Sequence, residues 1–255
     1  MNDVLPLFKS HYSLGRSILT LEKHGDSPED YPCSIIDIAK QNKLKKIFLV
    51  DDNMSGFLQA YTNCKDAGIS LVFGLRIAIC SDMLQKDEAA LKETCKYIIL
   101  AKNTRGYKKL IKIFSKAAQD GFYYYPRIDF SVLESFWSDA DLQLAIPFYD
   151  SFIFNNVMGS STCIPNFNYT EPVFFIEENN LPFDPLIKDR VEDYCKDKYE
   201  TVRTNTIYYR NKEDFLSYLT FRCVNNRSTL NKPQLDHMSS NLFCFENWEE
   251  QNGTV

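Results

Sequence analysis

Residues 46–79 carry the pattern that most restricts the fold, because they predict a strand, a helix and a strand in direct succession. Residues 46–50 form a short apolar run, residues 56–67 have helical spacing and stop before Gly68, and residues 69–79 form a second apolar run. Two buried strands joined through a helix normally pair in parallel. The segment therefore predicts a parallel sheet covered by helices.

The same alternation continues along the chain. Ser34 and Asp37 have capping-box spacing and predict a helix that runs to residue 42. Further helices are expected at residues 88–94, 104–118, 185–199 and 212–225, and further strands at residues 97–101, 173–176 and 202–208. The expected inner face of helix 104–118 consists of Leu110, Ile111, Phe114 and Ala118. Such repeated units fit a distorted α/β barrel, whose site lies at the carboxyl ends of its strands.

Composition narrows the class of protein. The 255 residues have a formal net charge of -5, so no positive field of the whole chain attracts nucleic acid or an anionic membrane. The sequence shows no signal peptide and no apolar run long enough to span a bilayer, so we expect a cytoplasmic protein. Eight widely spaced cysteines predict reduced thiols. The three histidines are His11, His24 and His237.

Asp51 and Asp52 stand where a buried strand is expected to meet a loop. Paired carboxylates at a strand end are typical of a metal site, although two such ligands would hold only one hard cation weakly. A second interpretation is that Asp51 caps the helix that begins nearby. The sequence pattern alone leaves both open.

Several segments resemble, in order, the N-terminal polymerase-and-histidinol-phosphatase (PHP) domain of bacterial DNA polymerase III alpha subunits. They are HYSLGRS, VDDNMSG, AYTNCKDAGISLVFG, LAKNTRGYKKLIKIFSKAAQDGFYYYPRIDFSVLE and TNTIYYRNKEDFLSYLTFRCVNNRSTL. The resemblance implies a distorted (β/α)7-like PHP barrel over residues 1–210. Residues 211–255 would form a C-terminal helix and extension that resembles the link toward the polymerase palm.

In the active members of that family, histidines and carboxylates hold two or three metal ions that activate water, so the ligands must be present as a set. The alternate histidines of the opening strand correspond to Leu5, Leu7 and Lys9 of this chain. The family's Thr-Asp-His triplet corresponds to residues 50–52, with Asp51 and Asp52 at its last two positions.

The remaining ligand positions are also changed. The glutamate that ends the next family strand corresponds to Arg76, and a histidine before LAKN corresponds to Lys96. A family cysteine falls near Phe148, and the closing histidine corresponds to Tyr208. Arginine and lysine repel metal cations, so we expect Arg76 and Lys96 to form ion pairs with the two aspartates instead.

The resemblance therefore implies an inactive domain that uses no metal or other cofactor. It would act as a scaffold or docking platform for a DNA polymerase catalytic chain or a proofreading exonuclease in DNA replication. The alternative is a metal-dependent phosphoesterase or 3'-5' exonuclease with unconventional ligands around Asp51 and Asp52.

Two further segments have more than one interpretation. A basic helix face is either a phosphate-backbone contact or an ordinary solvated face, and it consists of Arg105, Lys108, Lys109, Lys112 and Lys116. The aromatic run at residues 122–127 either stacks on nucleobases or packs in the core or an interface, and we favour packing.

Overall fold

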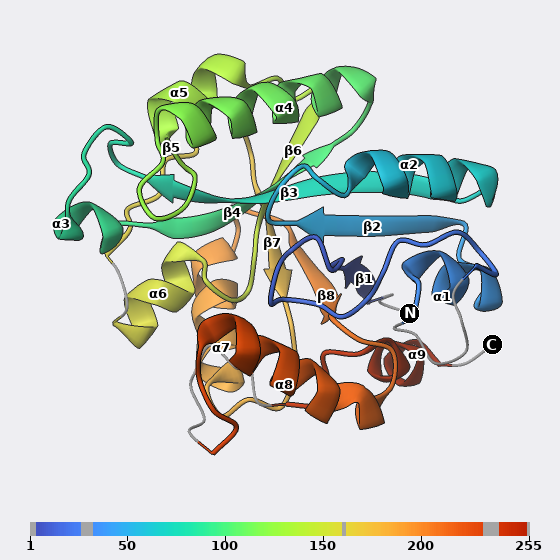
Figure 1. Ribbon diagram of the computed structural model, residues 1–255. Helices are drawn as coiled ribbons and strands as arrows, with labels where there is room; N and C mark the ends of the chain where they lie inside the picture. Colours follow the sequence, from blue (N-terminus) through green and yellow to red (C-terminus); the bar gives the residue numbers. More distant parts are fainter. Residues whose placement is uncertain (1–3, 27–32, 160–161, 232–239, 254–255) are drawn as a thin grey trace.

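The computed structural model of the protein describes residues 4–26, 33–159, 162–231 and 240–253. Its strands are β1 (Leu5–Phe8), β2 (Lys46–Asp51), β3 (Ser70–Cys80), β4 (Cys95–Ala101), β5 (Arg127–Asp129), β6 (Leu142–Ile146), β7 (Val173–Ile176) and β8 (Thr201–Ile207). Its helices are α1 (Ile35–Gln41), α2 (Phe57–Asp66), α3 (Glu88–Leu91), α4 (Thr104–Gln119), α5 (Phe130–Phe136), α6 (Phe152–Met158), α7 (Asp184–Cys195), α8 (Phe215–Asn226) and α9 (Phe245–Asn252), with a 3-10 turn η1 (Lys212–Asp214) before α8. The helices lie around the outside of the sheet (Figure 1).

Seven of the described strands form a closed barrel. They pair in the order β2-β1-β8-β7-β6-β4-β3, and a pairing between β2 and β3 closes the ring. Strand β3 also holds β5 because it is 11 residues long. Its residues 70–75 pair with β2, and its residues 78–80 pair with β5 along the same edge. This arrangement confirms the predicted distorted (β/α)7-like barrel.

Strand β4 gives the barrel its irregularity. It is antiparallel to both of its neighbours, β3 and β6, whereas the other pairs in the ring are parallel. The beginning of β4 therefore lies beside the carboxyl end of β3, with Lys96 opposite Ala78. A residue at the start of one strand thus reaches the rim formed by the ends of the others.

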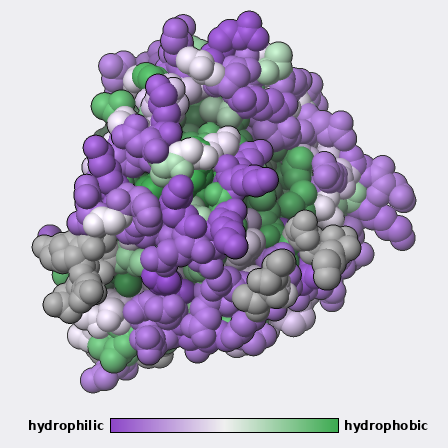
Figure 2. Space-filling view, turned by 90° about the vertical axis from the view of Figure 1, so that its right-hand side faces the viewer, coloured by the Kyte–Doolittle hydropathy of each residue, from purple (hydrophilic) through white to green (hydrophobic). Residues whose placement is uncertain are grey.

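The interior of the barrel is apolar through most of its depth. Its cluster contains Leu7, Val50, Ile98, Leu100, Ala145 and Phe175, with Leu5, Phe48, Val72, Val173 and Val202 packed against them. These side chains alternate along each strand, as the two-residue period of a strand requires. Figure 2 is seen from the side at which β2 and β3 begin, and it shows hydrophobic side chains set within a largely hydrophilic surface. Leu5 and Leu7 therefore serve as core residues.

Two local predictions need correction. The Ser34 side chain caps α1 by accepting a hydrogen bond from the Ile36 amide, but Asp37 does not complete a capping box. Its carboxylate instead lies 2.6 Å from Nδ1 of His24 and accepts a hydrogen bond from the Gly25 amide. Asp37 therefore contacts His24 and Gly25.

The inner face of α4 is rotated from the predicted one. Its buried side chains include Leu110, Ile113 and Ala117, whereas Ile111 is 41% exposed. Gly106 belongs to the same face and lies so close to the barrel that an added Cβ would stand 2.1 Å from the Asp141 carbonyl oxygen. That backbone contact at Gly106 fixes the rotation of α4, which hydrophobic spacing alone could not determine.

Residues after β8 pack partly on the barrel. The ring of Phe245 in α9 stacks on Phe8 of β1 at a centroid distance of 5.9 Å. At the start of β1, the carbonyl of Val4 accepts a hydrogen bond from Trp248 Nε1, and the Val4 amide donates to Asn252. The domain boundary expected after residue 210 stays a prediction.

Among the helices of the described residues, none combines the length and the apolar character needed to cross a bilayer.

Candidate functional site at the carboxyl end of the barrel

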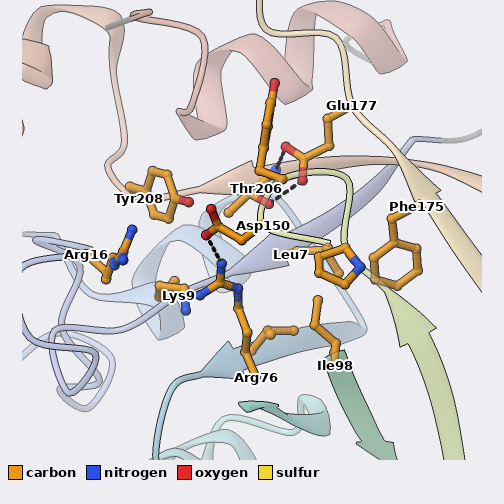
Figure 3. Close-up of a pocket in the computed structure, with 13 residues that line it drawn as sticks. Leu7, Lys9, Arg16, Arg76, Ile98, Asp150, Phe175, Glu177, Thr206 and Tyr208 are labelled. Carbon is orange, nitrogen blue, oxygen red and sulfur yellow. Dashed lines mark hydrogen bonds and ion pairs between the residues drawn. The ribbon is translucent and has the colours of Figure 1, made fainter. Parts of the chain in front are cut away.

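The carboxyl end of the barrel gathers most of the residues singled out in the sequence. Lys9 follows β1, Asp51 ends β2 and Asp52 comes directly after it, and Arg76 projects from β3. Figure 3 shows Lys9, Arg76 and Tyr208 around a small pocket, with Leu7 and Ile98 at its apolar side. Leu5 belongs to the interior cluster instead.

Asp51 is fully buried and serves as an internal anchor. One of its oxygens accepts hydrogen bonds from the Ser10 amide at 2.9 Å and the Ser13 hydroxyl at 2.8 Å, and the other accepts from the Ser10 hydroxyl at 2.6 Å. These contacts tie the loop after β1 to the end of β2. Helix α2 has Gly56 at its N-cap without a side-chain cap, so the interpretation of Asp51 as a helix cap is wrong.

Asp52 lies between two basic side chains. Its Oδ1 is 3.0 Å from Lys9 Nζ and 3.3 Å from Arg76 Nη1. Burial alone would raise the pKa of Asp52, but the charges of Lys9 and Arg76 outweigh burial and hold that pKa well below its ordinary value. Asp52 therefore stays ionised within a protein-only charge cluster.

Arg76 also pairs with a residue that the sequence analysis did not single out. Its Nη2 contacts Asp150, in the loop between β6 and α6. Asp150 has a φ of 60°, a left-handed conformation that is uncommon for a residue other than glycine. Its backbone carbonyl accepts a hydrogen bond from the Lys96 amide at 2.8 Å, which holds this loop against β4. Asp150 lies in the loop that follows the buried strand β6, and an acidic residue in such a loop was the available sequence signal.

Lys96 differs from the expectation. The expected pairing of Arg76 with Asp52 is present, but the Lys96 ammonium lies over the ring of Tyr125, 5.0 Å from its centroid, and forms no ion pair among the described residues. Burial and the nearby Arg76 charge lower the pKa of Lys96 to about 8, although Asp52 opposes this change. Lys96 therefore adds positive charge to the rim without neutralising either Asp51 or Asp52 directly.

A buried carboxylate from β7 completes the pocket. Glu177 accepts hydrogen bonds from the amide of Thr206 at 3.1 Å, from its hydroxyl at 2.6 Å, and from Asn179 Nδ2 at 3.0 Å. Figure 3 shows both contacts with Thr206. Burial raises the pKa of Glu177 to about 7. Glu177 directly follows the predicted strand 173–176, which again was the only sequence signal for it.

The side chains at this end do not fit a cluster of metal ions. Lys9, Arg76 and Lys96 line the pockets at this end, and none of them coordinates a cation while protonated. Across the described ranges, no three or more His, Cys, Asp or Glu side chains are placed so that they could hold a metal ion. Tyr208 stacks on Tyr218 at 5.4 Å, with nearly parallel rings.

Two of the histidines, His11 and His24, have their partners outside this cluster. His11 Nδ1 is 3.3 Å from the carbonyl oxygen of Leu19, and His24 contacts Asp37. His237 lies outside the described residues.

The basic face of α4 is partly engaged by the protein itself. Arg105 pairs with Asp141 at 3.0 Å, Lys109 donates to the Phe136 carbonyl at 2.9 Å, and Lys116 pairs with Asp120. Lys108 and Lys112 are exposed. A nucleic-acid contact by this face stays a prediction.

The aromatic run divides between surface and pocket. Phe122 and Tyr124 are exposed, so these two residues do not pack in the core, and their packing in an interface stays a prediction. Tyr125 instead lines a pocket next to Lys96.

Comparison with known proteins places the chain in context. The family model described as PHP domain matches residues 10–224. The chain is 27% identical to DNA polymerase III subunit alpha of Borreliella burgdorferi over 85% of this chain and 20% of that subunit. It is 24% identical to the same subunit of Aquifex aeolicus over 78% of this chain and 18% of that subunit. The chain thus spans about a fifth of the length of these relatives.

We expect Arg76→Ala to lower the free energy of unfolding by about 2–4 kcal/mol, because it leaves Asp52 and Asp150 without their shared cation. The loss should fall short of that for a fully buried pair, since both carboxylates keep some solvent contact. Urea denaturation at pH 7 measures the change. The matched control is Arg105→Ala, whose arginine is 76% exposed and should contribute less than about 1 kcal/mol. Equal stability of Arg76→Ala and the parent would contradict this account.

Glu177 should make stability depend on pH. Burial raises its pKa from an ordinary 4.5 to about 7, so the folded state binds this proton more tightly than the unfolded state does. Its contribution is therefore complete below pH 4.5 and is lost as the pH rises to about 7. Glu177→Gln should flatten this dependence and exceed the parent in stability at pH 8 by roughly 1–3 kcal/mol. Urea denaturation from pH 5 to pH 8 tests this, and an unchanged slope would count against it.

Proposed function

The chain belongs to the PHP domain family, and from this premise we propose that it is a catalytically inactive member that serves as a scaffold in a DNA replication complex. The observation that carries the proposal is the ion-paired position of Arg76 between Asp52 and Asp150. A metal-dependent phosphoesterase needs a cation-binding set at this end of the barrel. In this protein Asp52 already pairs with Lys9 and Arg76, and Asp150 pairs with Arg76.

The competing function is a metal-dependent phosphoesterase or 3'-5' exonuclease built on Asp51 and Asp52. Both oxygens of Asp51 accept hydrogen bonds from Ser10 and Ser13, and the carboxylate is fully buried. Asp52 would have to release Lys9 and Arg76 before it could bind a cation. Both features favour the inactive scaffold.

The proposed partner is a DNA polymerase catalytic chain. The relatives named DNA polymerase III subunit alpha extend far beyond the matched part, so a nucleotidyl-transfer site would lie in the part without a counterpart here. A proofreading exonuclease is the other partner that the resemblance implies. In either case the scaffold needs a surface for protein contact.

Helix α8 supplies a suitable surface. Leu216 is 62% exposed and Val224 is 73% exposed, and Phe221 between them is also exposed. Residues 216, 220 and 224 recur at a spacing of four and so share one side of the helix. In Figure 1, α8 lies at the lower edge of the molecule. We assign this exposed apolar side of α8 to contact with the polymerase chain, because α8 lies at the end of the family match and the relatives are much longer than the matched part.

A catalytically inactive domain should retain no metal after the purified protein is dialysed against manganese and zinc. Inductively coupled plasma mass spectrometry measures the metal content. The melting temperature of the protein should be the same with and without a chelator, because no ligand set contributes to folding. One or more metal ions retained per chain, with a lower melting temperature after chelation, would overturn the proposal of an inactive domain. Cleavage of phosphodiester substrates would then be assayed.

The docking surface predicts that Leu216→Asp combined with Val224→Asp weakens binding to the polymerase chain of the same organism by at least tenfold. Isothermal titration calorimetry measures the binding, and circular dichroism checks the fold. The matched control is Leu58→Asp on α2, where the leucine is 71% exposed. Equal binding by the double variant and the control would reject the assignment. Loss of exonuclease binding alone would retain the surface and change the partner.

A further inference from the structure

A second, larger pocket adjoins the ion-paired cluster. It has a volume of about 400 Å³, against about 30 Å³ for the pocket in Figure 3, and the two share Arg16, Arg76 and Asp150. Ligand pockets in proteins commonly begin at about 300 Å³. The larger pocket therefore has room for a small organic molecule.

The charges around this pocket are unbalanced toward positive. Its basic lining residues are Arg16, Arg76 and Lys96, and its acidic ones are Asp52 and Asp150. Both carboxylates contact Arg76, and Asp52 also contacts Lys9. This local excess is unusual in a chain with a net charge of -5. It favours an anion over a cation as the ligand.

Lys96 is the residue at which an anion would gain most. Its ammonium has no carboxylate within ion-pair distance among the described residues, and it lies over the Tyr125 ring at the pocket wall. Burial and the neighbouring arginines lower the pKa of Lys96 to about 8, which shows that its charge is poorly compensated. A bound anion would compensate that charge directly.

Part of the pocket lining is apolar and aromatic. Phe114, Tyr125 and Pro126 line the same pocket, and their surfaces suit the ring of a base or sugar better than further charge. The amide group of Asn155 lies at the rim, where it donates to the Thr94 carbonyl at 3.1 Å. The pocket thus combines a basic corner with an aromatic side.

We propose that this pocket binds a nucleoside monophosphate without a metal ion, with the phosphate at Lys96, Arg76 and Arg16 and the nucleoside against Tyr125 and Phe114. A phosphate group offers several acceptor oxygens, and arginine and lysine are its usual protein donors. The basic side chains then supply the positive charge at this end of the barrel. This inference goes beyond the scaffold role and does not depend on it.

Isothermal titration calorimetry in a chelator at low salt tests the proposal with three probes: a deoxynucleoside monophosphate, inorganic phosphate and the unphosphorylated nucleoside. We expect saturable binding of the monophosphate, weaker binding of inorganic phosphate and at least tenfold weaker binding of the nucleoside. Binding should weaken as salt is raised, because charges on both partners are screened.

Lys96→Met should weaken binding of the monophosphate at least tenfold while leaving the melting temperature close to that of the parent. Lys65→Met, at an exposed position on α2, is the matched control and should bind as the parent does. Should Lys96→Met fail to fold, amide chemical shifts of the parent show whether the monophosphate perturbs residues 94–96 and 125–126. Absence of saturable binding, equal affinity for the nucleoside, or unchanged binding by a folded Lys96→Met would overturn the proposal.

Discussion

The carboxyl end of this barrel depends on the ion pairs of the Arg76 guanidinium. It stands between carboxylates from two other segments, Asp52 after β2 and Asp150 after β6, so one cation joins three parts of the rim. Asp52 also holds Lys9 after β1. Such a cluster is stable as a set, since removing one member leaves an opposite charge poorly solvated. Side chains of Lys9 and Arg76 supply the positive charge that these carboxylates contact.

The barrel topology explains why these charged side chains gather at the carboxyl end of the barrel. Beneath Arg76 the interior is filled by Leu7, Val50, Ile98 and Phe175, which offer no polar partner. The antiparallel direction of β4 brings Lys96 to the same rim, because the start of β4 lies beside the end of β3. Charges that cannot move inward must pair across the rim or with a ligand from solvent. The ion pairs and the proposed phosphate site are two outcomes of this one constraint.

Much of the architecture could be predicted from the sequence, and the site only in part. Alternating apolar runs and helix caps located β2, α2 and β3, because local periodicity determines which face each element buries. The pairing of Arg76 with Asp52 was expected from the family resemblance, which assigned both residues to ligand positions of one site, and from their opposite charges. Asp150 and Glu177 escaped prediction because their roles depend on the pairing of β6 and β7 with distant strands. The rotation of α4 depended on a backbone contact at Gly106 that has no hydrophobic signature.

We propose that the Arg76 ion pairs lie where a metal-dependent PHP domain would hold its metal ions. The most direct test is a crystal structure of the protein grown with manganese, using anomalous diffraction at the manganese absorption edge. We expect Arg76 in contact with both Asp52 and Asp150, with no anomalous peak beside these carboxylates. An anomalous peak coordinated by Asp51 or Asp52, with the Arg76 side chain turned away, would contradict it.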